Sequence, residues 1–402
     1  MKYVVFNSQL KQLFNKCLGD NQCAAPVVEL DYRHKGSLVI VNGTCLHNHH
    51  FEWRSQPLSN KMAIGNLLLA ASILYSGNTY TTAAEIFDTF KLKFFSENDF
   101  YYIQRKYLLP VVNSMWNSQQ QQLLSEYEGN TDLIVAGDGR SDSPGHSAVV
   151  KVTEVNNSYS MEKEGLIRCL NQLEEAHVTV TTLATDRHPQ ISKLMKDEYS
   201  TISHQYDVWH MSKSIKKKLA AAAKRRECAE LQPWIKSIGN HFWWCSDSCN
   251  GDAIELKCWE NYQVYCHTGD LEVFHNVLLK NVPKRIAFRY EGTVARTLLA
   301  ALDNNTNVGR KQATTISGEK RWKLQWSKAS HQFVVKKIND PKEFTFRTDL
   351  LNATLDMHKS GSETEQSAIK IPVLARNSTG RGEKPFKTEA IEGLISRLGK
   401  NE

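Results

Sequence analysis

The chain has 402 residues, of which 41% are hydrophobic and 23% charged, a composition ordinary for a soluble globular protein of two or three domains. Its net charge of +7 favours an anionic partner without identifying one. The N-terminus lacks the apolar run of a signal peptide, and the longest apolar stretch, near residues 64–75, is too short and too amphipathic to cross a bilayer. We therefore expect a nuclear or cytosolic protein, with no membrane segment, whose nine cysteines are reduced thiols or metal ligands rather than disulfides.

Residues 1–56 are predicted to form a β-rich module of the zinc-binding type, with the alternating apolar pattern of a strand at 37–42. Cysteine thiolates and histidine imidazoles are the ligands that a structural Zn²⁺ takes in tetrahedral geometry. The expected ligands are Cys17, Cys23, Cys45 and His49. An alternative set joins the first two cysteines to His47 and His49, a spacing similar to that of WRKY-type zinc modules. Free cysteines beside exposed histidines are the simpler alternative.

Residues 57–130 are predicted to be helical. Apolar periodicity indicates helices at 63–76 and 82–90, and the segment Ser96 to Asp99 fits a capping box that opens a third, longer helix. The helices between residues 82 and 111 have helix-turn-helix proportions, although core packing alone would explain their apolar positions. The basic residues there that could contact phosphate groups are Lys91, Lys93, Arg105 and Lys106.

An α/β region begins near residue 131. Buried strands are predicted at 131–136 and 178–184, and each is followed by an aspartate, Asp138 or Asp186. The ends of strands in an open α/β sheet are where side chains converge on a ligand. Two converging carboxylates repel each other, so we expect Mg²⁺ or Mn²⁺ between them. Taken singly, each aspartate would be only a turn or capping residue. Further strands are predicted at 149–155 and 203–208, and helices at 162–176 and directly after Pro189.

Four motifs follow one another along this part of the chain. They are Asp-Gly-Arg-Ser-Asp-Ser-Pro-Gly-His at 138–146, Thr-Asp-Arg-His at 185–188, Asp-Val-Trp-His at 207–210 and Thr-Gly-Asp-Leu-Glu-Val-Phe-His at 268–275. In this order they resemble the DDE transposases that carry a C/D-x-x-H motif, most closely the Kolobok-like transposase relatives of animal genomes. The resemblance covers about residues 5–340. It implies a ribonuclease H-like core, a mixed sheet flanked by helices, at 131–340, with a helical insertion at about 228–266.

The resemblance also implies the chemistry, which is metal-dependent DNA cleavage and strand transfer at transposon ends. The expected compartment is the nucleus, and the chain could form a homo-oligomer. Its catalytic metal ligands would be Asp138, Asp186 and Glu272, which hold Mg²⁺ or Mn²⁺. The residues expected to position double-stranded DNA are Asp207, Trp209, His210, Lys213, Lys216, Lys217 and Arg225. The basic ones lie on a helix predicted at 212–226 and would contact phosphates. There are simpler alternatives to these DNA-positioning roles. Asp207 and His210 could be a capped helix start, and Trp209 could be a core residue.

The chain departs from the family pattern in two places. After residue 148 there is room for one strand where the family has a hairpin, and the segment between residues 259 and 268 is shorter than in relatives. These gaps indicate an internally deleted copy, so a catalytically inactive, domesticated nuclear DNA-binding protein is the alternative function. An unrelated metal-dependent nuclease is a third hypothesis.

Three further features complete the sequence-based predictions. Trp322 and Trp326 are interleaved with basic residues and form a potential stacking surface for bases. Residues 341–402 are predicted to be a polar, largely disordered tail. A second zinc site could be formed by Cys245, Cys249, Cys258 and Cys266.

Overall fold

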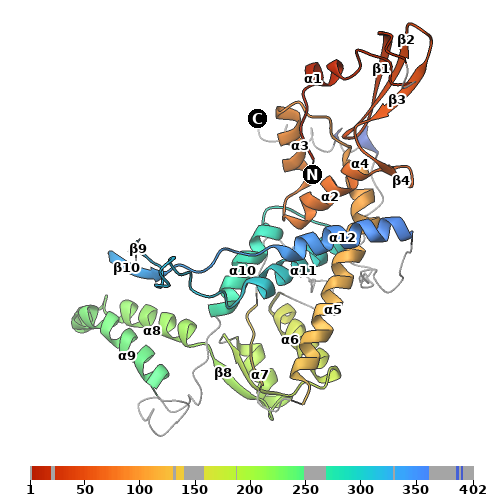
Figure 1. Ribbon diagram of the computed structural model, residues 1–402. Coiled ribbons are helices and arrows are strands. Elements are labelled where there is room, and N and C mark those ends of the chain that lie inside the picture. Colours follow the sequence, from red (N-terminus) through yellow and green to blue (C-terminus); the bar gives the residue numbers. More distant parts are fainter. Residues whose placement is uncertain are drawn as a thin grey trace. The chain divides into compact units, whose positions relative to one another are not determined.

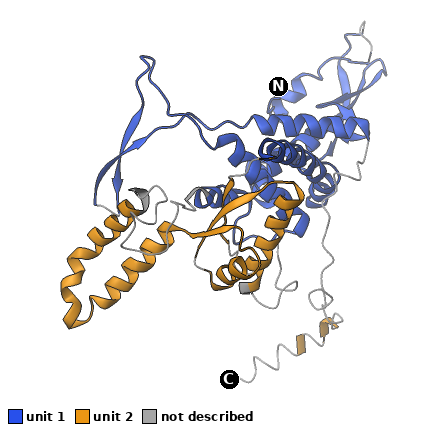
Figure 2. Cartoon of the chain, turned by 90° about the horizontal axis from the view of Figure 1, so that it is seen from below, with its two compact units in different colours: residues 1–128, 268–369 blue, residues 129–267, 370–402 orange. Residues whose placement is uncertain are grey.

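The computed structural model describes residues 2–19, 23–129, 133–139, 158–186, 188–248, 269–328, 331–361, 386–388 and 391–392 (Figure 1). The chain divides into two compact units, which we call unit 1 (residues 1–128 and 268–369) and unit 2 (residues 129–267 and 370–402) (Figure 2). Unit 1 combines antiparallel strands with helices, and unit 2 contains a small parallel sheet flanked by helices. Within the described ranges, no helix is long and apolar enough to span a membrane.

The N-terminal part of unit 1 is an antiparallel sheet of three strands in the order β1-β2-β3, which confirms the predicted β-rich module. Leu38 and Val41 of the middle strand are fully buried. Phe14, also buried, packs edge-on against Trp53, with 5.3 Å between the ring centroids. The elements are α1 (Asn7–Gln12), β1 (Val27–Lys35), β2 (Leu38–Cys45), β3 (His50–Arg54) and the short hairpin of β4 (Leu58–Ser59) and β5 (Met62–Ala63).

The helical part of unit 1 surrounds one hydrophobic core, to which Leu67, Leu108 and Leu299 contribute fully buried side chains. The predicted capping box is confirmed, because Ser96 and Asp99 exchange side-chain and backbone hydrogen bonds at the start of α4. The helices are α2 (Ile64–Tyr75), α3 (Tyr80–Thr89), α4 (Glu97–Ile103), the π-helix η1 (Gln104–Leu108), α5 (Leu109–Tyr127), α10 (Gly269–Asn281), α11 (Tyr290–Asn307) and α12 (Thr345–Ser360).

A buried arginine joins the two separate chain segments of unit 1. The Arg296 guanidinium on α11 donates hydrogen bonds to the carbonyl oxygens of Gly77, Asn78 and Asn281, and it lies 4.4 Å from the Phe288 ring centroid. Burial lowers the pKa of Arg296 to about 10. The segment after residue 268, predicted to continue the α/β core, therefore packs with the N-terminal helices instead.

The prediction of a disordered tail from residue 341 is wrong for its first part, which forms α12. The composition there is polar, but Phe346 and Leu350 lie on one face of the helix and are buried in the core. Thr354 adds a 2.7 Å hydrogen bond to the hydroxyl of Tyr75. Gly361, at a φ of +66°, ends the helix in the left-handed conformation that favours glycine. Apart from residues 386–388 and 391–392, the rest of the predicted tail lies outside the described residues.

Unit 2 is built on three parallel strands in the order β6-β7-β8. Leu183 of the central strand packs with Leu170, Ile191 and Met195 from the flanking helices. The elements are β6 (Leu133–Ala136), α6 (Ser158–Glu175), β7 (Val180–Thr185), α7 (Pro189–Asp197), β8 (Ser203–Tyr206), α8 (Val208–Ala222), the 3₁₀ helix η2 (Arg226–Trp234) and α9 (Ile235–Ser248). The strand predicted at 149–155 lies outside the described residues.

Unit 1 also carries an antiparallel ribbon formed by β9 (Trp322–Ser327) and β10 (Gln332–Lys337). Its base is held to the end of α11, because Asn307 donates to the Glu343 carbonyl and accepts from the Glu343 N–H, each at 2.9 Å.

The position of α12 in the core can be tested by truncating its central leucine. We expect Leu350→Ala to lower the free energy of unfolding by about 2–5 kcal/mol, because it leaves a cavity in a closely packed core. The exposed neighbour Asp349 provides the matched control Asp349→Ala. Urea denaturation that gives equal midpoints for both variants would show that α12 does not pack in this core.

Candidate functional site

Three aspartates follow the three parallel strands of unit 2 at the same edge of the sheet. The register pairs Ala136 of β6 with Ala184 of β7, and the Gly137 N–H donates a 2.8 Å hydrogen bond to the Ala184 carbonyl. Two residues further along each strand, Asp138 and Asp186 therefore occupy neighbouring positions. On the other side of β7, the Asp207 N–H donates a 2.8 Å hydrogen bond to the Thr185 carbonyl. The strand-end arrangement that the sequence predicts for Asp138 and Asp186 is thus present in the backbone.

Asp186, after the central strand, and Asp207, after the outer strand β8, differ in what their side chains do. Asp186 is partly exposed and accepts one hydrogen bond, at 3.2 Å, from the backbone N–H of His188 at the start of α7. Asp207 is 1% exposed and caps α8, accepting from the N–H groups of Trp209 and His210. The His210 Nδ1 lies 2.6 Å from the same carboxylate. The capped helix start, the alternative for Asp207 and His210, is therefore what the geometry shows.

Glu162 on α6 is an acidic neighbour of this edge that the sequence-based reasoning missed. A Cβ added at Gly139 would come within 2.6 Å of the Glu162 carboxyl carbon, so this side chain lies directly against the segment that carries Asp138. Burial raises the pKa of Glu162; His188 opposes the rise, and the charges of Asp186 and Asp138 add to it. The Nε2 atom of His188 lies 3.9 Å from a Glu162 oxygen. Three carboxyl groups therefore interact at this edge.

Glu272, the third predicted metal ligand, belongs to unit 1. It lies on the first turn of α10 and its side chain is exposed, while its carbonyl accepts a 3.0 Å hydrogen bond from Asn276. Only two of the three acids that the resemblance names are thus found in the same compact unit.

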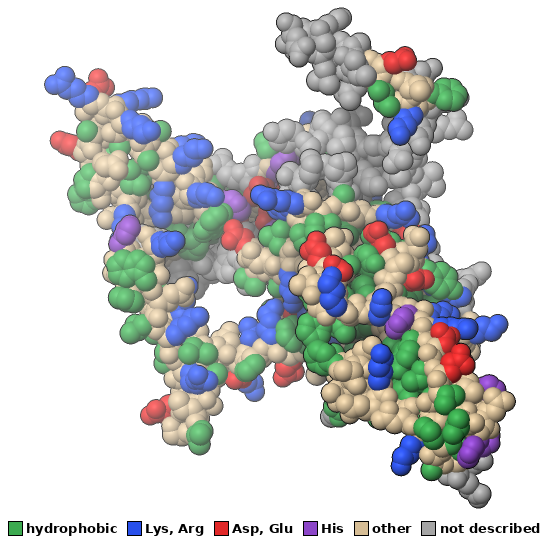
Figure 3. Space-filling model, turned by 90° about the horizontal axis from the view of Figure 1, so that it is seen from above, with side chains coloured by type: hydrophobic (Ala, Val, Ile, Leu, Met, Phe, Trp, Pro, Cys, Tyr) green, Lys and Arg blue, Asp and Glu red, His purple; other side chains and the backbone are tan. Residues whose placement is uncertain are grey.

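The basic residues predicted to contact DNA lie on and after α8. Lys213, Lys217 and Arg225 are exposed, and Lys216 is partly exposed. The helix begins earlier than predicted, at Val208, and ends at Ala222, so Arg225 lies beyond it. Trp209 is 39% exposed rather than buried in a core, and the Lys213 ammonium lies 4.4 Å from its ring centroid. Lys and Arg side chains are spread over the face of the molecule in Figure 3 together with hydrophobic ones.

The four predicted zinc ligands of unit 1 come together. Their sulfur and nitrogen atoms all lie within 4.8 Å of one another, in a cluster of Cys17, Cys23, Cys45 and His49. A tetrahedral Zn²⁺ holds such ligand atoms about 3.5–3.8 Å apart, so a small contraction would complete the coordination. The Cys17 Sγ to His49 Nδ1 distance is already 3.8 Å. The chemistry of the donors and their spacing both fit, and this cluster could bind a zinc ion.

The backbone prepares the cluster for a metal. Burial of the Cys45 sulfur opposes ionisation, but hydrogen bonds from the backbone of His49, from Cys17 and from the backbone of His47 outweigh it and lower the pKa of Cys45. A thiolate is the form that binds zinc. Gly19 lets the loop pass the His50 carbonyl, which would lie 2.7 Å from a Cβ at this position.

The alternative zinc ligand His47 lies beside the cluster, with its Nδ1 atom 3.5 Å from the Cys23 sulfur. Of the second predicted zinc site, only Cys245 is described, 3.4 Å from His241 Nε2; the other three cysteines lie outside the described residues.

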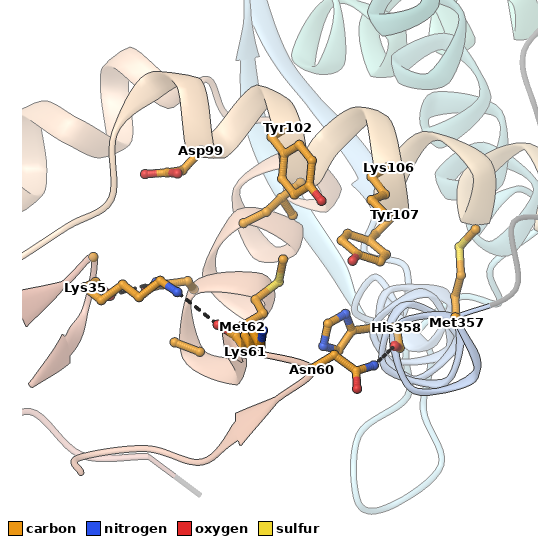
Figure 4. A pocket seen from close by; sticks show the side chains of 15 residues that line it. Lys35, Asn60, Lys61, Met62, Asp99, Tyr102, Lys106, Tyr107, Met357 and His358 are labelled. Atoms are coloured by element: carbon orange, nitrogen blue, oxygen red, sulfur yellow. Dashed lines mark hydrogen bonds between the residues drawn. The ribbon is translucent and has the colours of Figure 1, made fainter. Parts of the chain in front are cut away.

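A basic pocket in unit 1 is lined from β1, the β4–β5 turn, α4, η1 and α12 (Figure 4). Its lining includes three lysines, Lys35, Lys61 and Lys106, and one acidic residue, Asp99. The Lys106 ammonium, one of the predicted phosphate contacts, lies 5.8 Å from the Tyr102 ring centroid and 5.7 Å from that of Tyr107. The excess of cations favours an anionic group there.

The two possible zinc ligand sets share His49 and differ at Cys45 and His47, so they make opposite predictions for variants of those two residues. We expect His49→Ala and Cys45→Ser to lower the zinc content of the purified chain from about one ion to about none. His47→Ala should leave the content unchanged, since this imidazole lies outside the cluster. Metal analysis of the three variants measures this. Zinc loss in His47→Ala together with retention in Cys45→Ser would establish the alternative set.

Glu162 gives unit 2 a pH dependence of known sign. Its carboxyl group binds a proton more readily in the folded than in the unfolded chain, so its ionisation weakens the fold above the raised pKa, and stability returns as the pH falls. In buffer without divalent cations, Glu162→Gln should therefore protect the β6 and β7 amides from hydrogen exchange at neutral pH. The gain should disappear near the ordinary pKa of 4.5. The exposed Glu175 on the same helix supplies the control Glu175→Gln, and a gain that is equal at both pH values would contradict the assignment.

Searches of known protein families, of curated proteins and of solved structures with this chain find no match.

Proposed function

We propose that the chain derives from a DNA transposase with a ribonuclease H-like core and that unit 2 binds a divalent cation for phosphodiester chemistry on DNA. The observation that supports this most directly is the register of β6 and β7, which gives Asp138 and Asp186 adjacent positions at one edge of the sheet. A strand-end pair of acids is the arrangement that the transposase resemblance requires. The strand order β6-β7-β8, all parallel, is also compatible with such a core.

The local electrostatics favour a cation at this edge. Glu162 is harder to ionise because of its burial and of the charges on Asp186 and Asp138. A hard divalent cation such as Mg²⁺ or Mn²⁺ takes carboxylate oxygens as ligands and would relieve this repulsion. Asp138 and Asp186 would hold it, since Asp186 is partly exposed and makes only one side-chain hydrogen bond that we describe.

A bound cation of this kind activates a water molecule or a 3′-hydroxyl and stabilises the leaving oxygen in phosphodiester transfer. In cleavage, the new bond joins a water oxygen to phosphorus and the bond to the 3′-oxygen breaks, leaving a 3′-hydroxyl once that oxygen takes a proton from solvent. In strand transfer, the 3′-hydroxyl replaces water as the nucleophile. The resemblance names Glu272 as the third carboxylate.

The residues around α8 would hold the DNA strand. Exposed Lys213, Lys217 and Arg225 provide phosphate contacts, and Trp209, already beside a lysine, offers its ring to an unpaired base. Asp207 would act indirectly, by fixing the start of α8 and the imidazole of His210. The expected partner is double-stranded DNA with transposon ends, and the expected compartment is the nucleus.

One observation favours the second candidate, a DNA-binding protein that has lost catalysis. Asp207, one of the three acids at the strand ends, is buried as the cap of α8, which is a structural role. In this alternative, the basic surface is retained and the carboxylates have only a structural role.

Nicking of supercoiled DNA separates the two candidates. With Mg²⁺, we expect the chain to nick the plasmid, and Asp138→Asn or Asp186→Asn to lower the rate by roughly a thousandfold, because each removes a ligand charge. The exposed acid of α7 supplies the control Asp197→Asn, which should be unaffected. The same assay applied to Glu272→Gln reports on the third carboxylate.

DNA binding by each variant, measured in parallel by anisotropy, should remain unchanged. An active Asp138→Asn variant, or binding without nicking in the wild-type chain, would exclude catalysis at this edge. Joining of a labelled 3′-end to target DNA distinguishes a transposase from a simple nuclease.

A further inference from the structure

The β9–β10 ribbon presents two faces of different chemistry. Trp326 is paired with Phe333, Leu324 with Val335 and Trp322 with Lys337 across the ribbon. Directly paired residues share a face, and alternate residues of a strand point to opposite faces. One face therefore carries Trp322, Leu324, Trp326, Phe333, Val335 and Lys337. The other carries Lys323, Gln325, Ser327, Gln332, Val334 and Lys336.

The apolar face is open. Trp322 and Trp326 are about half exposed, at 51% and 50%, and Phe333 is 68% exposed. The Trp326 and Phe333 rings stand edge to face, 5.2 Å apart, so they support each other without being covered. Contiguous exposed apolar surface on a folded protein usually marks a site of interaction.

The charge around this face identifies the kind of partner. Residues 310–343 contain nine lysines and arginines against three acidic residues, a net charge of +6 out of the +7 of the whole chain. Residues 322–337, the ribbon itself, carry four of these lysines and no acidic residue, and such a concentration of positive charge attracts a polyanion. Aromatic rings among positively charged side chains favour a polyanion that also exposes flat apolar groups. A nucleic acid with unpaired bases is such a polyanion.

The base of the ribbon is fixed, so the surface is preorganised. Ala313 donates to the Ile338 carbonyl at 2.8 Å, and Ile338 donates to the Arg321 carbonyl at 3.1 Å. Together with the two Asn307–Glu343 hydrogen bonds, these contacts connect the ribbon to α11. A prearranged surface loses less conformational freedom on binding.

We propose that the aromatic face of the β9–β10 ribbon, defined by Trp322, Trp326 and Phe333, binds single-stranded DNA by stacking on its bases while Lys337 on the same face contacts its phosphates. A single strand fits better than an intact duplex, because the bases of a duplex expose only their edges in the grooves. This inference rests on the proposed function and deepens it, since a strand opened beside a cleavage site is the substrate that such a surface would hold.

The test is the binding of fluorescein-labelled oligothymidine to the full-length chain, without Mg²⁺, measured by anisotropy. We expect Trp322→Ala and Trp326→Ala each to raise the Kd about tenfold. Trp326→Phe, which keeps a ring, should retain most of the affinity. An exposed tryptophan of unit 2 supplies the control Trp234→Ala, which should bind like the wild type. A duplex of the same length should bind more weakly than the single strand and be insensitive to the ribbon tryptophans.

The lysines have a separate readout. Each phosphate contact on a single strand contributes about 0.7 to the slope of log K against log salt concentration, so Lys337→Gln, on the aromatic face, should reduce the slope by about 0.7. Lys336→Gln, on the opposite face, should change the slope less.

Three outcomes would overturn the proposal: equal binding of oligothymidine by the tryptophan variants and the wild type, tighter binding of the matching RNA than of the DNA, or self-association of the chain that Trp326→Ala abolishes. The last would assign the face to a second copy of the chain. Failure of the proposed catalysis is distinguishable, because Asp138→Asn would still bind oligothymidine. Conversely, tryptophan variants that bind oligothymidine like the wild type and still nick DNA would reject the ribbon surface and leave the proposed catalysis intact.

Discussion

The candidate cation site of this protein depends on the parallel pairing of β6, β7 and β8. Parallel strands end at the same edge of a sheet, and each of these three is followed by an aspartate at Asp138, Asp186 or Asp207. The fold thereby concentrates negative charge at one place, and the raised pKa of Glu162 is a sign of the resulting repulsion as well as of burial. Asp207 has a structural role instead: it is buried under the first turn of α8, which its carboxylate caps. Asp138 and Asp186 are both partly exposed at this edge.

The candidate zinc ligands of unit 1 are brought together without parallel strands. The cysteines and His49 come from short segments that backbone hydrogen bonds bring together, such as the one from the Cys17 N–H to the Ala25 carbonyl. The small sheet around them has few large buried residues, and a metal ion would supply stability that such a module otherwise lacks. The two candidate ion sites would thus differ in kind: the cluster of unit 1 offers soft ligands for a structural ion, and the proposed site of unit 2 offers hard oxygen ligands at a sheet edge.

Local patterns predicted much of this. The β-branched run before Thr185 predicted β7, Ser96 and Asp99 predicted a helix start, and the cysteines and histidine of the N-terminal module predicted a cluster that could bind zinc. What failed required tertiary contacts. Glu162 was not found because only the packing of α6 places it against Gly139. The helix α12 was missed because its polar composition hides one buried face, and nothing in the sequence around Arg296 shows that its guanidinium joins α11 to the end of α2.

The central claim, that Asp138 and Asp186 together hold a divalent cation, is tested most directly by the loss of the free Mn²⁺ signal in electron paramagnetic resonance as the chain is titrated. The zinc-loaded wild-type chain should bind Mn²⁺, and Asp138→Asn and Asp186→Asn should each abolish that binding while the fold and the zinc content stay unchanged. Binding of equal affinity in the wild type and in both variants would contradict the claim, and so would a folded wild-type chain that binds no Mn²⁺ at all.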